Sequence, residues 1–347
     1  MSGTSLDGLD IAYCSFNADS NQSWSFDIHH ADTIRYDDEL VSKLKNSIHL
    51  SGLELFELHN ELGNFIGNTT NQFIQTHGID QANIDAIASH GHTVFHQPDK
   101  KLTTQIGNGG NIAAITQLPV ISDFRTIDVA LGGQGAPLVP IGDELLFNEY
   151  DYCINLGGIA NLSYTKNGVR IAFDICPTNI VLNKLAQLAG KPFDDGGEIA
   201  RSGNINDQLL NALNTIEYYQ HPPPKSLGLE WVNTTIFPLL EKQIITIEDQ
   251  LATFVEHIAI QIANSIATNN SKILFSGGGT MNTFLIERIK NNTNNTIIVP
   301  EKNIIEYKEA LIFAFLGVLR LRNEKNCLQS VTGASANNVG GCIYQAF

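Results

Sequence analysis

The chain has 347 residues, more than one hydrophobic core usually holds, which favours two domains with a cleft between them. Hydrophobic residues make up 43% and charged residues 16%, as in an ordinary folded protein and not a disordered or fibrous one. The net charge of −15 gives no attraction to a nucleic-acid backbone, so we expect no nucleic-acid partner.

The first half of the chain alternates strands and helices in its apolar pattern. Short alternating runs indicate strands, and recurrence every three or four residues indicates helices, with a break at Ser51-Gly52. The expected elements are strands at 9–14 and 24–28, two helices within 37–77, a strand at 84–89, a helix at 111–117 and a strand at 118–122.

Turn residues concentrate at 131–137, and we expect a hinge near this stretch. The predicted domains are therefore 1–140 and 141–347, with the last residues able to return to the first domain. The pattern restarts after the hinge, with strands at 152–156, 159–164 and 169–175 and helices near 179–189, 248–268, 280–289 and 309–322. Both halves open with a strand, a glycine turn and a second strand, which hints at a duplicated α/β unit.

The first candidate phosphate site is the N-terminal segment, because the sequence has neither the Gly-x4-Gly-Lys-Ser/Thr loop nor a Gly-x-Gly-x-x-Gly turn opening a helix. Residues 2–5 offer backbone amides and three hydroxyl groups. Asp7 and Asp10 offer carboxylate oxygens for a magnesium ion or its waters. The alternative is a polar turn with an Asp-Gly hairpin at Asp7-Gly8.

Two further glycine turns could bind phosphate or adenosine. Gly157-Gly158 joins one expected strand to another, so its amides could face a phosphate. The alternative is a plain hairpin, which would have the same sequence pattern. Residues 277–279 are three consecutive glycines between a buried strand and a helix expected at Thr280. They would let a flat adenosine lie against the backbone.

Asp174 is the proposed general base, because it ends an apolar strand where open α/β sheets bind ligands. A helix cap or a hydrogen-bonded turn residue is the alternative.

His90, His92 and His96 could form a metal site, but hydrogen-bonding or substrate-facing histidines are the better interpretation, since no acidic or cysteine ligand lies at the usual spacing. Glu309 could equally be a solvated acid in a first helical turn.

Five widely spaced cysteines without a Cys-x-x-Cys pair favour a reduced, cytoplasmic protein. The sequence opens with no secretion signal, and no apolar run approaches the roughly 20 residues that span a bilayer. We therefore expect no membrane partner.

Taken together, these segments resemble the anhydro-N-acetylmuramic acid kinases, a branch of the sugar kinase, actin and heat-shock chaperone superfamily. The resemblance covers nearly the whole chain. It runs through residues 1–10, 90–96, 123–125, 132–138, 155–162, 276–282, 308–311 and 331–334.

The resemblance implies an α/β fold of two actin-like (ribonuclease H-like) domains with an ATP and substrate cleft between them. The first domain would carry the substrate and phosphate side and the second the adenosine side. The implied enzyme opens the anhydro bridge of 1,6-anhydro-N-acetylmuramic acid with water, which Asp174 activates, and transfers the γ-phosphoryl group of ATP to O6. The products, N-acetylmuramic acid 6-phosphate and ADP, belong to cell-wall recycling, and a homodimer is the family expectation.

The resemblance also implies the site residues. ATP would contact Gly3, Thr4, Ser5, Leu6, Asp7, Gly8, Leu9, Asp10, Gly157, Gly158, Gly277, Gly278, Gly279 and Asn282. Asp7 and Asp10 would hold Mg²⁺ directly or through water. The sugar would contact His92, Arg125, Gln134 and Glu309.

The chain departs from the family pattern at several positions. Relatives carry a strand before the first glycine turn, so here we expect either an upstream start or a looser loop. The family's Thr-Gly-Pro-Gly after the catalytic aspartate is Ile-Cys-Pro-Thr at 175–178, and a further acid on the next helix is Asn183. Leu227 and Leu229 replace a Thr and an Arg, and His92 stands where Gln is usual. These changes leave open one alternative function, a nucleotide-binding scaffold or regulator without turnover. A second alternative is a metal hydrolase built on the three histidines.

Overall fold

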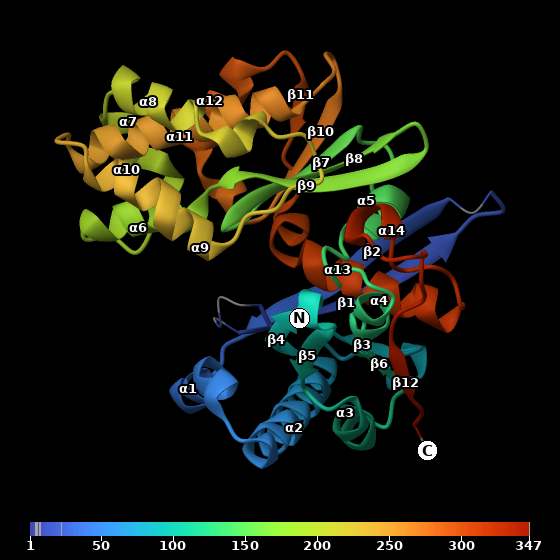
Figure 1. Cartoon of the computed structure of the whole chain (residues 1–347). Coiled ribbons are helices and arrows are strands. Elements are labelled where there is room, and N and C mark those ends of the chain that lie inside the picture. Colours follow the sequence, from blue (N-terminus) through green and yellow to red (C-terminus); the bar gives the residue numbers. More distant parts are fainter. Residues whose placement is uncertain (4–5, 7, 22, 347) are drawn as a thin grey trace. The chain divides into compact units, whose positions relative to one another are not determined.

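The computed structural model describes residues 1–3, 6, 8–21 and 23–346. Contacts within the chain divide it into two compact units (Figure 1). The first unit comprises Met1–Leu146 and Tyr307–Phe347, and the second comprises Phe147–Glu306. The predicted domain boundary stays a prediction, and each unit is described by itself.

The first unit opens with an antiparallel pair, β1 (Leu9–Ala18) and β2 (Trp24–Ile34), as expected for a meander. The register shifts between Tyr13 and Cys14. Ser2 bridges Leu9 in the antiparallel sense, on the side of β1 away from β2.

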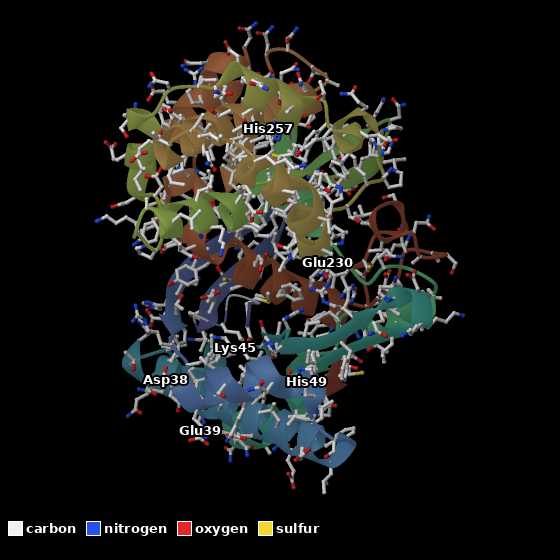
Figure 2. The ribbon with its side chains drawn as sticks, turned by 60° about the vertical axis from the view of Figure 1, so that its left-hand side comes forward. Asp38, Glu39, Lys45, His49, Glu230 and His257 are labelled. Atoms are coloured by element: carbon white, nitrogen blue, oxygen red, sulfur yellow. The ribbon has the colours of Figure 1, made fainter. Side chains whose placement is uncertain are left out.

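Two capped helices follow, and both were predicted. α1 (Asp38–Asn46) has acids in its first turn and lysines in its last, among them Asp38, Glu39 and Lys45, labelled in Figure 2. These charges complement the helix dipole. α2 (Gly52–Thr76) begins at Ser51, which forms a capping box with Glu54, so the predicted break at Ser51-Gly52 is a helix start.

The rest of the first unit is a three-stranded sheet, a separate hairpin and several helices. In the sheet, β6 pairs with β3 in the parallel sense and with β12 in the antiparallel sense. The hairpin of β4 and β5 was not predicted. The bounds are β3 (Ile87–Ser89), β4 (His92–Gln97), β5 (Leu102–Ile106), α3 (Gly109–Thr116), β6 (Val120–Ser122), α4 (Thr126–Ala130), α5 (Pro140–Leu146), α13 (Lys302–Leu321), α14 (Gln329–Thr332) and β12 (Cys342–Tyr344). Of α13, the part from Tyr307 onwards belongs to this unit.

The second unit is built on one five-stranded sheet in the order β11-β10-β7-β8-β9. An antiparallel meander of three strands continues into two strands parallel to β7. The bounds are β7 (Tyr152–Leu156), β8 (Ile159–Lys166), β9 (Val169–Pro177), β10 (Lys272–Ser276) and β11 (Thr296–Ile298).

Helices gather around α11 beside this sheet (Figure 1). They are α6 (Asn179–Leu188), α7 (Glu198–Ser202), α8 (Asp207–Asn214), α9 (Leu229–Trp231), α10 (Phe237–Glu241), α11 (Ile247–Ser265) and α12 (Thr283–Asn292). α11 carries the fully buried His257 (Figure 2), whose ring nitrogens bond Asn214 and Tyr219 and whose pKa burial lowers to about 3. A neutral histidine thus fixes α8 to α11.

The predicted α/β fold class is confirmed, and the mixed sheets in two units are consistent with an actin-like pair. Two helix starts differ from the expectation. The helix expected at Thr280 begins at Thr283, because Asn282 is its N-cap and a 3-10 turn precedes it. The helix expected at Glu309 begins at Lys302, because its first turns are largely polar and carry little apolar signal.

Candidate active site

The turn at Gly157-Gly158 joins β7 to β8 and lies against the start of α6. The Gly157 carbonyl oxygen accepts hydrogen bonds from the Thr178 hydroxyl at 2.6 Å and from the Asn179 amide at 3.3 Å. The Gly158 carbonyl oxygen accepts from the Thr178 amide at 2.9 Å. The turn is therefore fixed through its carbonyl groups.

The orientation of these carbonyls determines where the glycine amides point. In a trans peptide the N–H points opposite to the C=O of the preceding residue. The Leu156 and Gly157 carbonyls face α6, where Asn179 and Thr178 donate to them. The amides of Gly157 and Gly158 thus point away from α6, on one side of the turn.

The turn at 277–279 follows β10, the strand next to β7, and packs against Leu156. Gly277 has a φ of 83°, and a Cβ built on it would stand 2.9 Å from the Leu156 carbonyl oxygen. A Cβ on Gly279 would stand 2.8 Å from the same oxygen, whereas one on Gly278 would meet nothing within 4 Å. The two predicted glycine turns therefore lie side by side, and close packing requires glycine at 277 and 279.

Asp174 lies on β9, where it pairs across the ladder with Asn161. Its Oδ2 accepts a hydrogen bond from the Leu227 amide at 2.9 Å. Burial raises the pKa of the carboxyl, and the Leu227 bond partly opposes that change. Its side chain is only partly exposed. A partly desolvated carboxylate with a raised pKa is suited to accept a proton.

The segment from Lys225 to Leu227 supports Asp174 through backbone groups. The Asp174 amide donates to the Lys225 carbonyl at 3.1 Å, and the Tyr218 hydroxyl donates to the Asp174 carbonyl at 2.7 Å. Because the contact to the carboxylate comes from the Leu227 backbone, the leucine side chain at this position does not remove it. Sequence reasoning missed Tyr218, which no local motif marks.

Asn282 has a structural function in the second unit. Its Oδ1 accepts from the Leu285 amide at 2.9 Å and so caps α12. The side chain is buried. Its predicted contact with adenosine stays a prediction.

Arg125 organises the polar cluster of the first unit. Its Nε donates to His90 Nε2 at 3.0 Å, and its Nη1 donates to the Gly135 carbonyl at 2.6 Å. His90 Nδ1 donates to the Gly91 carbonyl at 2.9 Å, and because Nε2 accepts from Arg125 the ring is neutral with its proton on Nδ1. Burial and the neighbouring Arg125 hold the pKa of His90 well below its ordinary value, in agreement with that tautomer.

Glu309 lies on α13 within the electrostatic reach of Arg125. Solvent reaches its side chain, yet the surrounding protein desolvates the carboxyl and raises its pKa, and Arg125 opposes the increase. Burial lowers the pKa of Arg125, and Glu309 opposes that decrease. The preceding residue, Lys308, forms a buried ion pair with Asp143 of α5 at 2.7 Å. This pair anchors α13 next to Glu309.

Asp128 holds the glycine-rich turn that carries Gln134, and the sequence did not predict this function of Asp128. Its Oδ2 accepts from the Gly135 amide at 2.8 Å. Its Oδ1 accepts from Cys327 Sγ at 3.0 Å, and from Thr332 Oγ1 and Asn338 Nδ2 at 2.8 Å. Asp128 is fully buried, while Gln134 is exposed on the turn. The sequence signal that could have identified Asp128 is an acidic residue within an apolar segment.

The other two histidines have separate partners. His92 Nδ1 lies 3.2 Å from Ser2 Oγ, and His96 Nδ1 lies 3.2 Å from Thr103 Oγ1. Among the described residues, no group of three or more His, Cys, Asp or Glu side chains could hold a metal ion. His90 and His92 do not share a strand, because β3 ends at Ser89 and β4 begins at His92.

The N-terminal turn is described in part. Thr4, Ser5 and Asp7 lie outside the described residues. Gly3 and Leu6 are joined by a backbone bond of 3.4 Å, and Gly8 and Leu9 are buried at the start of β1. Asp10 Oδ1 accepts from the Thr33 hydroxyl at 2.6 Å.

The donor set at Asp10 fits magnesium when bound with a nucleotide. Magnesium usually takes one or two carboxylates and completes its shell with water and phosphate oxygens. The partly exposed Asp10 could serve as such a carboxylate.

The structure thus brings the predicted residues together in two groups. The second unit joins Gly157, Gly158 and 277–279 at the ends of adjacent strands, with Asp174 on the same sheet. The first unit joins Arg125 to the turn of Gln134, with Glu309 and His96 beside them. His92 lies with Ser2 instead. No described helix is long and apolar enough to cross a membrane.

Known proteins resemble the chain over its full length. The family model described as anhydro-N-acetylmuramic acid kinase matches residues 1–346. The anhydro-N-acetylmuramic acid kinase of Aliivibrio fischeri is 35% identical, with 100% of this chain and 98% of that protein covered. The protein of the same name from Pasteurella multocida is 36% identical, with 99% and 95% covered.

Among solved structures, the activator of the 2-hydroxyisocaproyl-CoA dehydratase from Clostridium difficile with bound ADPNP matches with a TM-score of 0.40. It is 14% identical and covers 82% of this chain and 84% of that one. A likeness at this level carries no argument about function.

Proposed function

The chain belongs to the family of anhydro-N-acetylmuramic acid kinases, and on this premise we propose that it phosphorylates 1,6-anhydro-N-acetylmuramic acid with ATP. Water adds to the anomeric carbon, the bond from that carbon to O6 breaks, and O6 takes the γ-phosphoryl group. The products are N-acetylmuramic acid 6-phosphate and ADP. The reaction returns a cell-wall fragment to metabolism.

One observation carries the proposal: a partly desolvated carboxylate, Asp174, lies on the sheet whose adjacent strands end in two glycine turns. In the proposal Asp174 accepts the proton of the attacking water. The amides of Gly157 and Gly158 donate to phosphate oxygens, and the turn at 277–279 lies against adenosine. Fixed donors stabilise developing charge without reorganising during the reaction.

The polar cluster of the first unit binds the sugar in this proposal. Arg125 is already held by His90 and Gly135, so its guanidinium offers its remaining donors in a fixed orientation. Glu309, Gln134 and His92 complete the sugar contacts. A bound sugar would thus meet groups whose positions are set before it arrives, which lowers the entropy lost on binding.

In the proposal the N-terminal turn, from Gly3 to Asp10, also binds the phosphates of ATP. Magnesium held through Asp10, and through Asp7 as predicted from the sequence, would neutralise charge on the phosphates. We further propose a cytoplasmic location and a homodimer.

The test is to incubate the protein with ATP, Mg²⁺ and the anhydro sugar in ¹⁸O-labelled water. We expect a 6-phosphate with ¹⁸O at the anomeric carbon, identified by mass spectrometry. Asp174→Asn should reduce product formation by about 100-fold or more while ATP binding persists, because a positioned base contributes about 10² to 10⁴.

A matched control is Asp151→Asn. Asp151 also accepts one backbone hydrogen bond, from the Lys272 amide at 2.8 Å, but it lies at the opposite end of β7. We expect near-normal turnover in this control. Equal turnover of Asp174→Asn and the native protein would remove Asp174 as the base, and absence of any phosphorylated sugar would remove the function.

A further inference from the structure

The contact that fixes the Asp174 carboxylate comes from a segment with few anchors of its own. The Leu227 amide donates to Asp174 Oδ2 at 2.9 Å, and the Asp174 amide donates to the Lys225 carbonyl at 3.1 Å. Residues 222–224, which precede this segment, are three exposed prolines without an N–H group to donate. Ser226 is exposed as well. A side-chain contact is therefore needed to hold residues 225–227 against β9.

The Lys225 side chain supplies such a contact, because its ammonium lies over two aromatic rings. Lys225 Nζ is 4.7 Å from the centre of the Tyr218 ring and 5.7 Å from the centre of the Phe173 ring. It also donates a hydrogen bond to the Tyr218 carbonyl oxygen at 3.3 Å. A lysine ammonium within about 6 Å of a ring centre is attracted by the ring face, and more strongly where it is desolvated. Burial lowers the pKa of Lys225, as expected for a partly desolvated ammonium.

Both rings belong to elements that hold Asp174. Phe173 directly precedes Asp174 on β9, and its side chain is buried. Tyr218 lies in the 3-10 turn Glu217–Gln220, and its hydroxyl donates to the Asp174 carbonyl oxygen at 2.7 Å. One ammonium thus joins β9, the 3-10 turn and residues 225–227.

We propose that Lys225 is a positioning residue for the base: its ammonium holds residues 225–227 on β9 and so keeps the Leu227 amide on the Asp174 carboxylate. Lys225 acts through Leu227 and not on the substrate. The role of Asp174 as the base belongs to the proposed function, on which this inference rests. The hold of Lys225 on the Leu227 amide can be measured without turnover.

The consequence for catalysis follows from the charge on Asp174. A hydrogen bond to an ionised carboxyl favours the ionised form, and here the Leu227 amide lowers the pKa of Asp174 against the effect of burial. Without the ammonium, the Leu227 amide would move away and burial alone would act. The pKa of Asp174 would then rise, and less of the base would be ionised at a given pH.

The titratable neighbours of this pair decide how the change is measured. Burial raises the pKa of three of them, which keeps them neutral where a carboxyl titrates: Tyr218, Tyr219 and Cys176. Glu230 of α9 (Figure 2) stands beside Gly228, where its Oε2 would lie 2.5 Å from a Cβ built on that glycine. A titration observed near Asp174 must therefore be assigned with Asp174→Asn.

The test follows the Leu227 amide by NMR in the full chain, labelled with ¹⁵N-leucine, without ATP or sugar. The signal is assigned by its loss in Leu227→Met. In the native protein we expect its proton shift to change with pH as the Asp174 carboxyl ionises, and Asp174→Asn should abolish that change. In Lys225→Met the change should become smaller, and its midpoint should rise by about one pH unit, because the carboxylate loses a charge-assisted hydrogen bond.

Turnover gives a second measurement. Lys225→Met should lower kcat by about tenfold or more with little change in KM, since a small misplacement of a catalytic group can cost about 10²-fold. The pH below which kcat/KM falls should rise, as in the Leu227 titration. Lys225→Arg should restore both properties, because a guanidinium also binds ring faces. Lys242→Met removes an exposed lysine of the same unit and should change neither.

An unchanged Leu227 titration in folded Lys225→Met would overturn the proposal. So would an equal loss in Lys225→Arg, because the charge would then not be the cause. If Lys225→Met fails to fold, Lys225→Gln replaces it, since glutamine keeps a donor for the Tyr218 carbonyl and lacks the charge. The expected NMR result without any sugar phosphorylation would support the positioning of the carboxyl and remove the proposed function alone.

Discussion

Replacing Asp128 with Asn tests whether one buried carboxylate holds the substrate-side turn. Asp128 accepts four hydrogen bonds, three at Oδ1 and one from the Gly135 amide at Oδ2. An asparagine keeps one acceptor and presents an NH₂ group at the other position. The less costly orientation keeps the acceptor for Cys327, Thr332 and Asn338 and points the NH₂ group at the Gly135 amide.

The expected loss follows from that orientation. One hydrogen bond to a charged acceptor disappears, worth about 1.5 to 3 kcal/mol, and two donors then face each other without an acceptor, at about 1 to 3 kcal/mol. We expect the first unit to lose about 3 kcal/mol of unfolding free energy. This corresponds to a decrease in Tm of about 6 to 12 °C.

Calorimetry and the KM for the sugar measure the two consequences. The KM should rise, because the Gly135 carbonyl holds Arg125 and the loosened turn no longer fixes it. The exposed Asp99 provides the control Asp99→Asn, for which we expect an unchanged Tm. A Tm within about 2 °C of the native value for Asp128→Asn would refute the reasoning.

Three further predictions follow from the same geometry. Gly277→Ala should weaken ATP binding and lower the free energy of unfolding by about 1 to 2 kcal/mol, because its Cβ meets a β7 carbonyl at positive φ. Gly278→Ala, whose Cβ would stand in open space, should change neither quantity. Titration calorimetry measures the binding, and urea unfolding measures the stability. Lys308→Met should cost about 3 to 5 kcal/mol in urea unfolding, since it breaks a buried ion pair, and Asp143→Leu in the same chain should restore part of the loss; a small single-variant effect would contradict this. The base must be ionised, and burial raises the pKa of Asp174, so kcat/KM should fall on acidification at a higher pH than an ordinary aspartate would give. A decrease of kcat/KM at the pH of an ordinary aspartate would contradict burial as the cause.

The sequence predicted those parts of the fold that local patterns encode. The helical spacing of apolar residues identified α2, and the apolar strands around Gly157 identified the meander of the second unit. The packing of the turn at 277–279 against the Gly157 turn follows from adjacent parallel strands. Such features depend on neighbours in sequence or on one strand pairing.

The parts that the sequence did not predict depend on distant partners. Asp128 receives three of its four hydrogen bonds from residues about 200 positions later, so its local sequence does not identify these partners. The hairpin of β4 and β5 is rich in Thr and Gln and carries little apolar alternation. Tyr218 reaches Asp174 through a backbone carbonyl, a contact that tolerates most local sequences. Tertiary contacts of this kind leave no periodic signal.

The first unit is assembled from both ends of the chain, with the second unit inserted at Phe147–Glu306. During synthesis the ribosome therefore releases a complete second unit before it releases β12, which pairs with β6, or Asn338, which donates to Asp128. The second unit can fold as it emerges, whereas the N-terminal segment cannot complete its sheet until β12 is released. Closing contacts across so long a separation is slow, so we expect the first unit to complete its folding after the second.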